Sequence, residues 1–137
     1  MPKIVFVDAH GWVALKHKGD HFFAEAHKLN RTLLQERTKS ITTNFVLDEA
    51  YTVLRARAGH HVAVELGEEI RVSQVTSVLH ISLELEAQAW EMFKKYNSKQ
   101  HWSFTDCTSF VVMKHLRITE AFTNDHHFQQ AGFIKLL

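Results

Sequence analysis

The chain has 137 residues, of which 45% are hydrophobic and 23% charged, which is the composition of a globular protein and excludes a disordered one. The net charge is only +1 with the eleven histidines neutral. A pure nucleic-acid-binding module, which has a strong excess of basic residues, is therefore excluded. A single cysteine, Cys107, excludes an internal disulfide and a cysteine-cluster metal site, and no N-terminal apolar stretch reaches the length of a signal peptide or a membrane span. We therefore expect a cytosolic protein without membrane contact.

The first expected element is a short, nearly continuous apolar run, Lys3–Val7, which stops at the carboxylate of Asp8. Its length and its β-branched residues are typical of a strand buried on both faces, and such a strand belongs at the centre of a parallel sheet. Ligands of parallel α/β sheets bind outside the carboxyl ends of the strands. Asp8 is therefore expected at the edge of the sheet where a ligand would bind.

The rest of the chain alternates helical periodicity with short apolar or β-branched runs. In chain order we expect a helix Gly11–Lys18, a helix His21–Arg37, a strand Ser40–Thr43, a helix Phe45–Ala58, a helix His61–Val72, a strand Val75–Ile81, a helix Leu83–Tyr96, a helix Ser103–Leu116, a strand Ala121–Thr123, a helical turn Phe128–Ala131 and an edge strand Phe133–Leu137. Asp20 and Asn44 are expected to cap the helices after them, and Gly19 and Gly59 to end the helices before them. Strands separated by helices need crossover connections, so we expect a single three-layer α/β/α domain over residues 1–137 with a mainly parallel sheet of about five strands.

Four acidic residues occupy positions that a parallel sheet would bring to one edge. Asp8 and Asp125 follow strands. Asp106 lies at a helix start after a loop, and Glu49 lies about one and a half turns into the helix after the second strand. Each aspartate also has a purely structural alternative: the two that follow strands fit helix N-caps, and Asp106 fits the acid of a capping box that begins at Ser103.

Glu49 is harder to explain as a structural residue. On a helix with about 100° per residue, Asp48 falls in the same sector as Thr52 and Arg55, which is the natural solvated face. Glu49 falls on an apolar sector instead. A carboxylate there is costly unless it is paired or bound to a cation, so the structural alternative is a salt bridge to a neighbouring Lys or Arg.

Several carboxylates held together repel one another and require cations. Oxygen-rich sites without cysteine suit Mg²⁺ or Mn²⁺. Such ions can activate water and stabilise charge on a phosphodiester during in-line displacement. The pattern therefore predicts a Mg²⁺ or Mn²⁺ site at this edge of the sheet.

The same segments resemble a PIN domain, and in particular the VapC-like toxins of bacterial and archaeal toxin–antitoxin pairs. The matching stretches span nearly the whole chain in the right order: Val5–Asp8 with Trp12, Thr42–Glu49, Ser103–Phe110, and Ala121–Phe128 with Gly132-Phe133. The resemblance implies a metal-dependent ribonuclease in which Asp8, Glu49, Asp106 and Asp125 form the catalytic, metal-binding tetrad. It also implies an RNA substrate, a small inhibitory antitoxin and a homodimer. One departure is that the small hydroxyl residue of the family near the first aspartate is not obvious, because Ala9 and His10 follow Asp8.

Two other functions remain open at the level of sequence. A phosphoacceptor signalling domain also places aspartates at strand ends, but the run Val75–Ile81 ends at Ser82 without one. A PIN-fold RNA- or protein-binding regulator that has lost catalysis is the second alternative, and the presence of all four acids argues against it. The histidines have no zinc-motif spacing; His126 and His127 flank a site acid, and a modulatory role in RNA binding is open for them, whereas His10 has no assigned role.

Overall fold

The computed structural model describes residues 3–137, apart from the side chains of 97 and 98, and these residues form five strands and seven helices. The strands are β1 (Ile4–Val7), β2 (Lys39–Thr43), β3 (Thr76–Leu79), β4 (Glu120–Phe122) and β5 (Ile134–Lys135). The helices are α1 (Ala9–Lys16), α2 (Phe23–Gln35), α3 (Asn44–Arg57), α4 (His60–Val72), α5 (Leu83–Gln100), α6 (Phe104–Leu116) and α7 (His126–Gln130).

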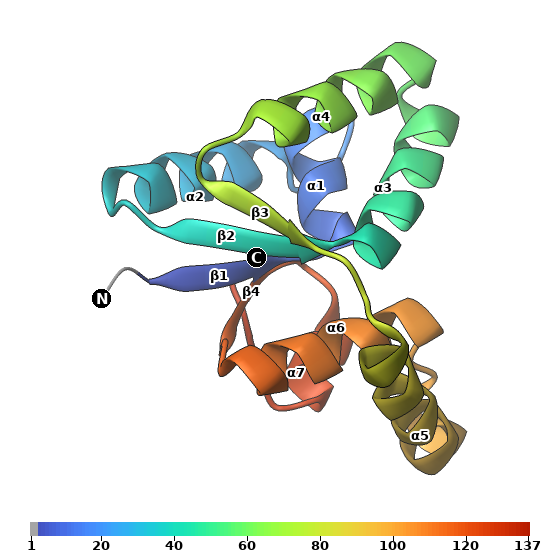
Figure 1. The fold of residues 1–137 in the computed structure, drawn as a ribbon. Helices are drawn as coiled ribbons and strands as arrows, with labels where there is room; N and C mark the ends of the chain where they lie inside the picture. The colour runs from blue at the N-terminus through green and yellow to red at the C-terminus, as the bar shows by residue number, and fades with distance from the viewer. Residues whose placement is uncertain (1–2) are drawn as a thin grey trace.

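All strand pairs are parallel, and the strand order is β3-β2-β1-β4-β5. Helices α1 to α4 cover one face of the sheet, and α5 to α7 cover the other (Figure 1). The expected three-layer α/β/α fold with a parallel sheet of five strands is therefore confirmed. Within the described residues, no helix has both the length and the apolar character that a membrane span requires.

The central strand is β1, as its uninterrupted apolar sequence indicates. Val5, Phe6 and Val7 are almost fully buried, and Phe6 lies beside Ile41 of β2 on one side and Ala121 of β4 on the other. The layer formed by α6 and α7 packs against this strand through aromatic rings, because Phe128 stands 6.4 Å from the Phe6 ring. The carboxyl half of β1 is thus packed between two strands and against the layer that contains α7.

Polar side chains begin several helices at the positions that the sequence indicates. Ser103 and Asp106 form the predicted capping box of α6, and Asp125 caps α7 by accepting a hydrogen bond from the backbone N–H of His127 at 3.0 Å. Ser82 caps α5 in the same way, through the N–H of Leu85. These caps fix the helix starts that line the carboxyl edge of the sheet.

Other helix boundaries differ from the sequence-based expectation. Thr43, and not Asn44, caps α3 by accepting from the Val46 N–H at 3.1 Å. The Asn44 side chain instead accepts from the N–H of Ile81 at 2.8 Å, which joins the start of α3 to the chain leaving β3. Asp20 lies before α2 but does not cap it: its carboxylate accepts from Phe22 N, and the helix starts one residue later.

Candidate active site

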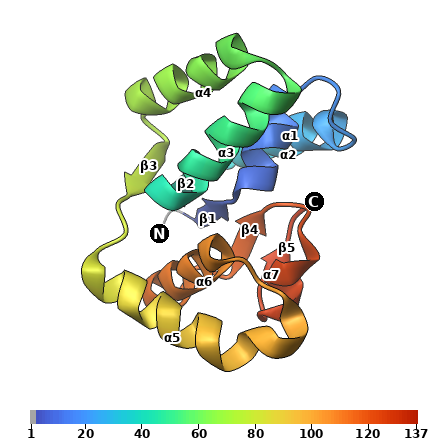
Figure 2. The same cartoon turned by 90° about the vertical axis from the view of Figure 1, so that its right-hand side faces the viewer.

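The four acidic residues all lie at the carboxyl edge of the sheet, which faces the viewer in Figure 2. Asp8 directly follows β1 and Asp125 follows the adjacent β4, whose Phe122 pairs with Val7. A carboxylate oxygen of Asp8, one of Asp125 and a ring nitrogen of His10 lie within 4.8 Å of one another. Parallel pairing of two adjacent strands therefore brings together aspartates that are 117 positions apart in the sequence.

Asp8 is 1% exposed, and its two oxygens have different environments. Its Oδ2 accepts hydrogen bonds from His10 Nδ1 and from Thr123 Oγ1, each at 3.0 Å. Its Oδ1 is buried and has no hydrogen-bond partner among the described residues. Although Asp8 occupies the N-cap position of α1, its side chain makes no capping bond. Since an unsatisfied buried acceptor is costly, this oxygen is available to a ligand or a water.

Asp106 forms the capping box and also lies close to the other acids of the cluster. Its Oδ2 accepts from the Ser103 N–H at 3.2 Å, as the capping box requires, and also from His127 Nδ1 at 3.0 Å. Burial, together with the nearby charges of Asp8 and Asp125, raises the pKa of Asp106 above its ordinary value. The capping role therefore does not separate Asp106 from the other acids.

Glu49 lies in the second turn of α3 and is partly buried, whereas the neighbouring Asp48 is exposed. This difference agrees with the helical-sector argument. Within the described part of the chain, Glu49 makes no ion pair with a Lys or Arg, so the salt-bridge alternative is not found. Burial, followed by the charges of Asp8 and Asp106, raises the pKa of Glu49. Glu49 also lines a small cavity of about 70 Å³ together with His10.

Asp125 completes the cluster from the start of α7. Its Oδ1 caps that helix, and its Oδ2 lies 3.9 Å from His10 Nδ1. Its backbone N–H donates to Thr123 Oγ1 at 3.1 Å. Thr123 thus accepts from Asp125 and donates to Asp8, which links the two strand-end aspartates.

His10 and Thr123 also lie in the cluster, although no sequence pattern predicts a site role for them. His10 contacts Asp8 and lies near Asp125. The hydrogen bond to Asp8 raises the pKa of His10 to about 9, and the charges of Asp8, Asp125 and Glu49 act in the same direction, whereas burial opposes the shift. Thr123, which is fully buried and directly follows β4, supplies a hydroxyl beside the first aspartate. The available signal was their spacing, since each stands two positions from an acid of the cluster.

The residues present fit a divalent cation. Carboxylates raise the pKa of one another here, so the cluster gains stability from added positive charge. Oxygen donors suit Mg²⁺ or Mn²⁺, and Asp8 Oδ1 is a buried acceptor facing no protein donor. His10 and His127 each hydrogen-bond an Oδ2 oxygen, of Asp8 and Asp106 respectively, and so orient those carboxylates.

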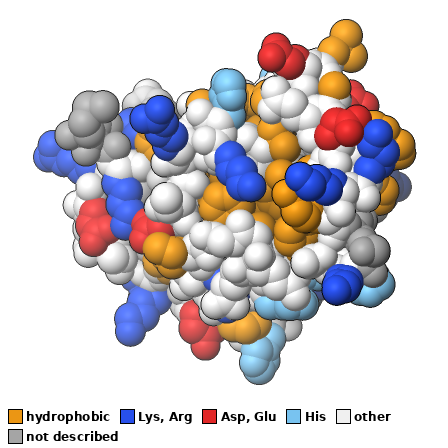
Figure 3. Space-filling model, turned by 90° about the horizontal axis from the view of Figure 1, so that it is seen from below, with side chains coloured by type: hydrophobic (Ala, Val, Ile, Leu, Met, Phe, Trp, Pro, Cys, Tyr) orange, Lys and Arg blue, Asp and Glu red, His pale blue; other side chains and the backbone are white. Residues whose placement is uncertain are grey.

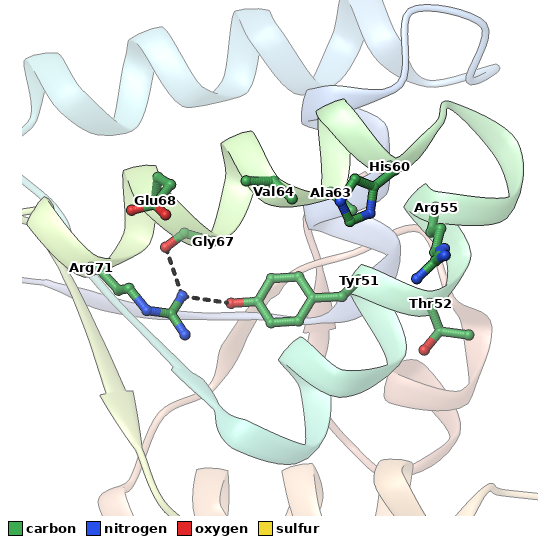
Figure 4. Close-up of a pocket in the computed structure, with 9 residues that line it drawn as sticks. All are labelled: Tyr51, Thr52, Arg55, His60, Ala63, Val64, Gly67, Glu68 and Arg71. Atoms are coloured by element: carbon green, nitrogen blue, oxygen red, sulfur yellow. Dashed lines mark hydrogen bonds between the residues drawn. The ribbon is translucent and has the colours of Figure 1, made fainter.

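A larger groove lies elsewhere, between α3 and α4 (Figure 4). It measures about 460 Å³ and is lined by residues that include Tyr51, Arg55 and Arg71. Arg71 is held there by its own helix, donating to the Gly67 carbonyl at 2.9 Å and lying 3.5 Å from the Tyr51 hydroxyl. None of the four clustered carboxylates lines this groove, so its size does not make it the site of the predicted chemistry.

A parallel α/β sheet with four acids at its carboxyl edge defines a class of protein, and the sequence comparison identifies the same class. The sequence model of the PIN domain matches residues 5–134. The chain therefore belongs to the PIN-domain family.

Individual relatives narrow this class further. Two curated proteins, both named 23S rRNA-specific endonuclease VapC20 and found in Mycobacterium tuberculosis strains CDC 1551 / Oshkosh and ATCC 25618 / H37Rv, are 37% identical over 133 residues, covering 97% of this chain and 98% of the relative. A crystal structure of M. tuberculosis VapC20, described as a Sarcin-Ricin loop cleaving toxin, matches with a TM-score of 0.85 and 36% identity, covering 96% of this chain and 97% of that one. The expected resemblance to VapC-like toxins is confirmed, and with it the prediction of a ribonuclease.

Proposed function

We propose that residues 1–137 form one PIN-like nuclease domain in which Asp8, Glu49, Asp106 and Asp125 bind Mg²⁺ or Mn²⁺ and hydrolyse RNA phosphodiester bonds. One observation carries this proposal: Asp8 Oδ1 is buried without a protein partner inside a cluster of carboxylates. Among the groups that this cluster would accept, a hard divalent cation best satisfies that oxygen. An inactive PIN-fold regulator would have no need to keep such a cluster.

When bound, the ion would supply activation of water and stabilisation of charge on the phosphate. The chain's own residues would hold the ligands in place. Thr123 and His10 fix Oδ2 of Asp8 and leave Oδ1 for the ion, and His127 does the same for Oδ2 of Asp106. The phosphoacceptor alternative has no support, because the three residues directly after β3 are His80, Ile81 and Ser82 and none of them is an aspartate.

For the substrate, we propose a structured loop of ribosomal RNA. VapC20 from M. tuberculosis is named as specific for 23S rRNA and described as cleaving the Sarcin-Ricin loop, and this chain aligns with it over nearly its full length. A net charge of +1 gives little field for tight sequence-independent RNA binding. Selection of a shaped loop through a few local contacts is consistent with that weak field.

We further propose that a small antitoxin restrains the enzyme in the cytosol and that the enzyme is a homodimer. A chain that cleaves ribosomal RNA needs an inhibitor in the cell that makes it. Membership in the same group as VapC-like toxins supports the antitoxin. The dimer stays a prediction from that resemblance, and the cytosolic location stays a prediction from the sequence.

The test is cleavage of a Sarcin-Ricin stem-loop RNA by chelator-treated protein to which Mn²⁺ or Mg²⁺ is returned. We expect cleavage within the loop only with metal, no cleavage by Asp8→Asn or Asp106→Asn, and no comparable cutting of a fully paired hairpin. Cleavage at the wild-type rate by both variants would refute the tetrad. Metal-dependent cutting without preference for the loop would refute only the proposed substrate.

A further inference from the structure

The structure exposes one tryptophan near the acidic cluster. Trp12 and Trp102 are 8% and 7% exposed, but Trp90 in the middle of α5 is 50% exposed. Leaving half of a large aromatic side chain in water forgoes a favourable burial. The contacts that Trp90 makes with Phe93 and Phe104 account for its buried half and not for its exposed half.

A continuous row of rings leads from Trp90 to the acidic cluster. Its ring centroid lies 6.4 Å from that of Phe104, and Phe104 lies 6.2 Å from Phe45. Phe104 is the first residue of α6, two positions before Asp106, and Phe45 stands one helical turn before Glu49. The row, defined as Trp90, Phe104 and Phe45, thus ends beside two of the four acids.

Trp90 stacks on Phe93 at 5.8 Å, but α5 has other residues that hold it in place. Phe93, one turn further along, meets Phe104 edge-on at 5.9 Å, and Ala89 is fully buried on the inner side of α5. These two residues already hold the helix against α6. Trp90 adds an exposed ring that extends the row outward.

The cations that could meet a polyanion lie in the part of the chain that follows Trp90, beginning with the second half of α5. The first half of α5 carries Glu84, Glu86 and Glu91, of which Glu91 pairs with Lys94 at 3.0 Å. From residue 92 to the end, the chain has six Lys or Arg residues and three acids. Two of these acids, Asp106 and Asp125, belong to the cluster, and the third, Glu120, pairs with Lys3 at 2.6 Å. On the face formed by α5, α6 and α7, hydrophobic side chains gather with Lys and Arg side chains around them (Figure 3). Exposed rings beside cations are the arrangement that binds single-stranded nucleic acid.

We propose that Trp90, continued by Phe104 and Phe45, is a stacking platform for an unpaired base of the substrate RNA next to the cleaved phosphodiester. This inference rests on the proposed ribonuclease function and adds a requirement to it: the RNA must present a base that has left its helix. Recognition of RNA commonly takes place through such splayed bases, which stack on aromatic side chains. Every base has a π-face, so the platform selects an unpaired conformation and not a sequence.

The test compares Trp90→Leu, Trp90→Phe and the control Leu83→Gln, which changes an 87% exposed apolar residue on the same helix. The substrate is a Sarcin-Ricin stem-loop RNA, used intact or with abasic nucleotides flanking the cleavage site. We expect Trp90→Leu to raise KM on the intact RNA by roughly tenfold, the order of one lost base–aromatic stack, with kcat and the thermal midpoint unchanged. Trp90→Phe should recover most of the affinity, and Leu83→Gln should behave as wild type. On the abasic RNA, wild type and Trp90→Leu should have the same KM.

Fluorescence tests the inference without cleavage. Because Trp90 is the exposed tryptophan, a 2′-O-methyl stem-loop RNA added with chelator should quench the emission of wild type and not that of Trp90→Phe. If wild type failed to cleave any RNA, the ribonuclease proposal would fail while this binding result still decided the stacking. An unchanged KM for Trp90→Leu, an equal loss on intact and abasic RNA, or conversion of a dimer to a monomer by Trp90→Leu would overturn the platform. The last outcome would assign this face to contact between copies of the chain.

Discussion

Asp8 shows how a single side chain can be positioned for a ligand. Two donors, His10 in α1 and Thr123 directly after β4, both form hydrogen bonds with Oδ2 of Asp8. With one oxygen fixed twice, the carboxylate cannot rotate without breaking two hydrogen bonds, each with a net value of about 1 kcal/mol or more for a charged acceptor. The other oxygen is thereby aimed in a constant direction.

Neighbouring acids on α3 provide a matched pair of variants. Glu49→Gln should lower RNA cleavage severely, because Glu49 is partly buried in the cluster and coupled to Asp8 and Asp106. Asp48→Asn should leave cleavage nearly unchanged, because Asp48 is exposed. Rates of stem-loop cleavage at saturating Mn²⁺ would measure both, and equal losses would show that Glu49 has no special place in the site.

In metal-free protein, protons on His10, Glu49 and Asp106 should offset part of the repulsion among the carboxylates. The His10 pKa rises from its ordinary 6.5 to about 9, so its contribution to stability is complete below about 6.5 and is lost as the pH rises through 9. The raised pKa values of Glu49 and Asp106 act in the same direction, since their charged forms oppose folding and protonation at lower pH relieves this. We expect the thermal midpoint with chelator to fall between pH 6.5 and 9, and to fall less in His10→Gln. A midpoint that rises over this range would contradict the assigned contacts.

Local sequence patterns identify some side chains of the cluster and miss others, because some contacts depend on the tertiary structure. Glu49 can be separated from Asp48 by local helical geometry, which the sequence contains. The contact of Thr123 with Asp8 depends on the pairing of β4 with β1 across 115 positions, so no local pattern reveals it. His10 was missed because the expected helix began at Gly11, whereas α1 begins at Ala9 and places His10 in its first turn.

At the scale of elements, the site depends on how closely α1 approaches the end of β4. A Cβ on Gly11 would lie 2.2 Å from the backbone oxygen of Phe122. The N–H of Asp8 donates to the same oxygen at 3.3 Å. Glycine is required at this position by contact and not by an unusual backbone angle, and the contact sets the distance between the two strand-end aspartates.

Gly11→Ala should therefore disturb both stability and activity. The clash is with backbone, which cannot rotate away, so we expect a loss of about 3 kcal/mol or more in the free energy of unfolding, at or above the upper range for overpacking, together with reduced cleavage. Gly67→Ala is the control, because a Cβ there meets the movable Arg71 side chain at 3.0 Å, and the gain in helix propensity of about 1 kcal/mol offsets the contact. Denaturant unfolding of the two variants would measure this, and equal stability would contradict the close packing of α1 on β4.

Element boundaries could be predicted where one cap dominates the local choice. The Ser103 capping box is such a case, and α6 starts where the sequence indicates. The start of α3 offers two good caps in succession, Thr43 and Asn44. Thr43 becomes the cap, and the Asn44 side chain accepts a hydrogen bond from the N–H of Ile81 instead. The α3 cap therefore depends on a tertiary contact made after the third strand.

At the scale of the whole molecule, the net charge of +1 is the sum of an acidic cluster and of an excess of basic residues elsewhere on the chain. The carboxylates converge at one edge of the sheet, while the last third of the chain carries an excess of Lys and Arg. A polyanion approaching the exposed lysines would reach a site that is itself anionic until a cation is bound. Metal binding and RNA binding should consequently support each other.

The most direct measurement of the central claim, that these carboxylates bind a divalent cation, is the thermal midpoint of the full chain with chelator and with excess Mn²⁺. A ligand that binds only the folded state stabilises it by about 2.7 kcal/mol at a hundred-fold excess over Kd. We predict that Mn²⁺ raises the midpoint of wild type and of Asp48→Asn by similar amounts and leaves that of Asp8→Asn and Glu49→Gln nearly unchanged. A midpoint of wild type that does not respond to Mn²⁺, or an equal rise in Asp8→Asn, would contradict a metal site built on Asp8.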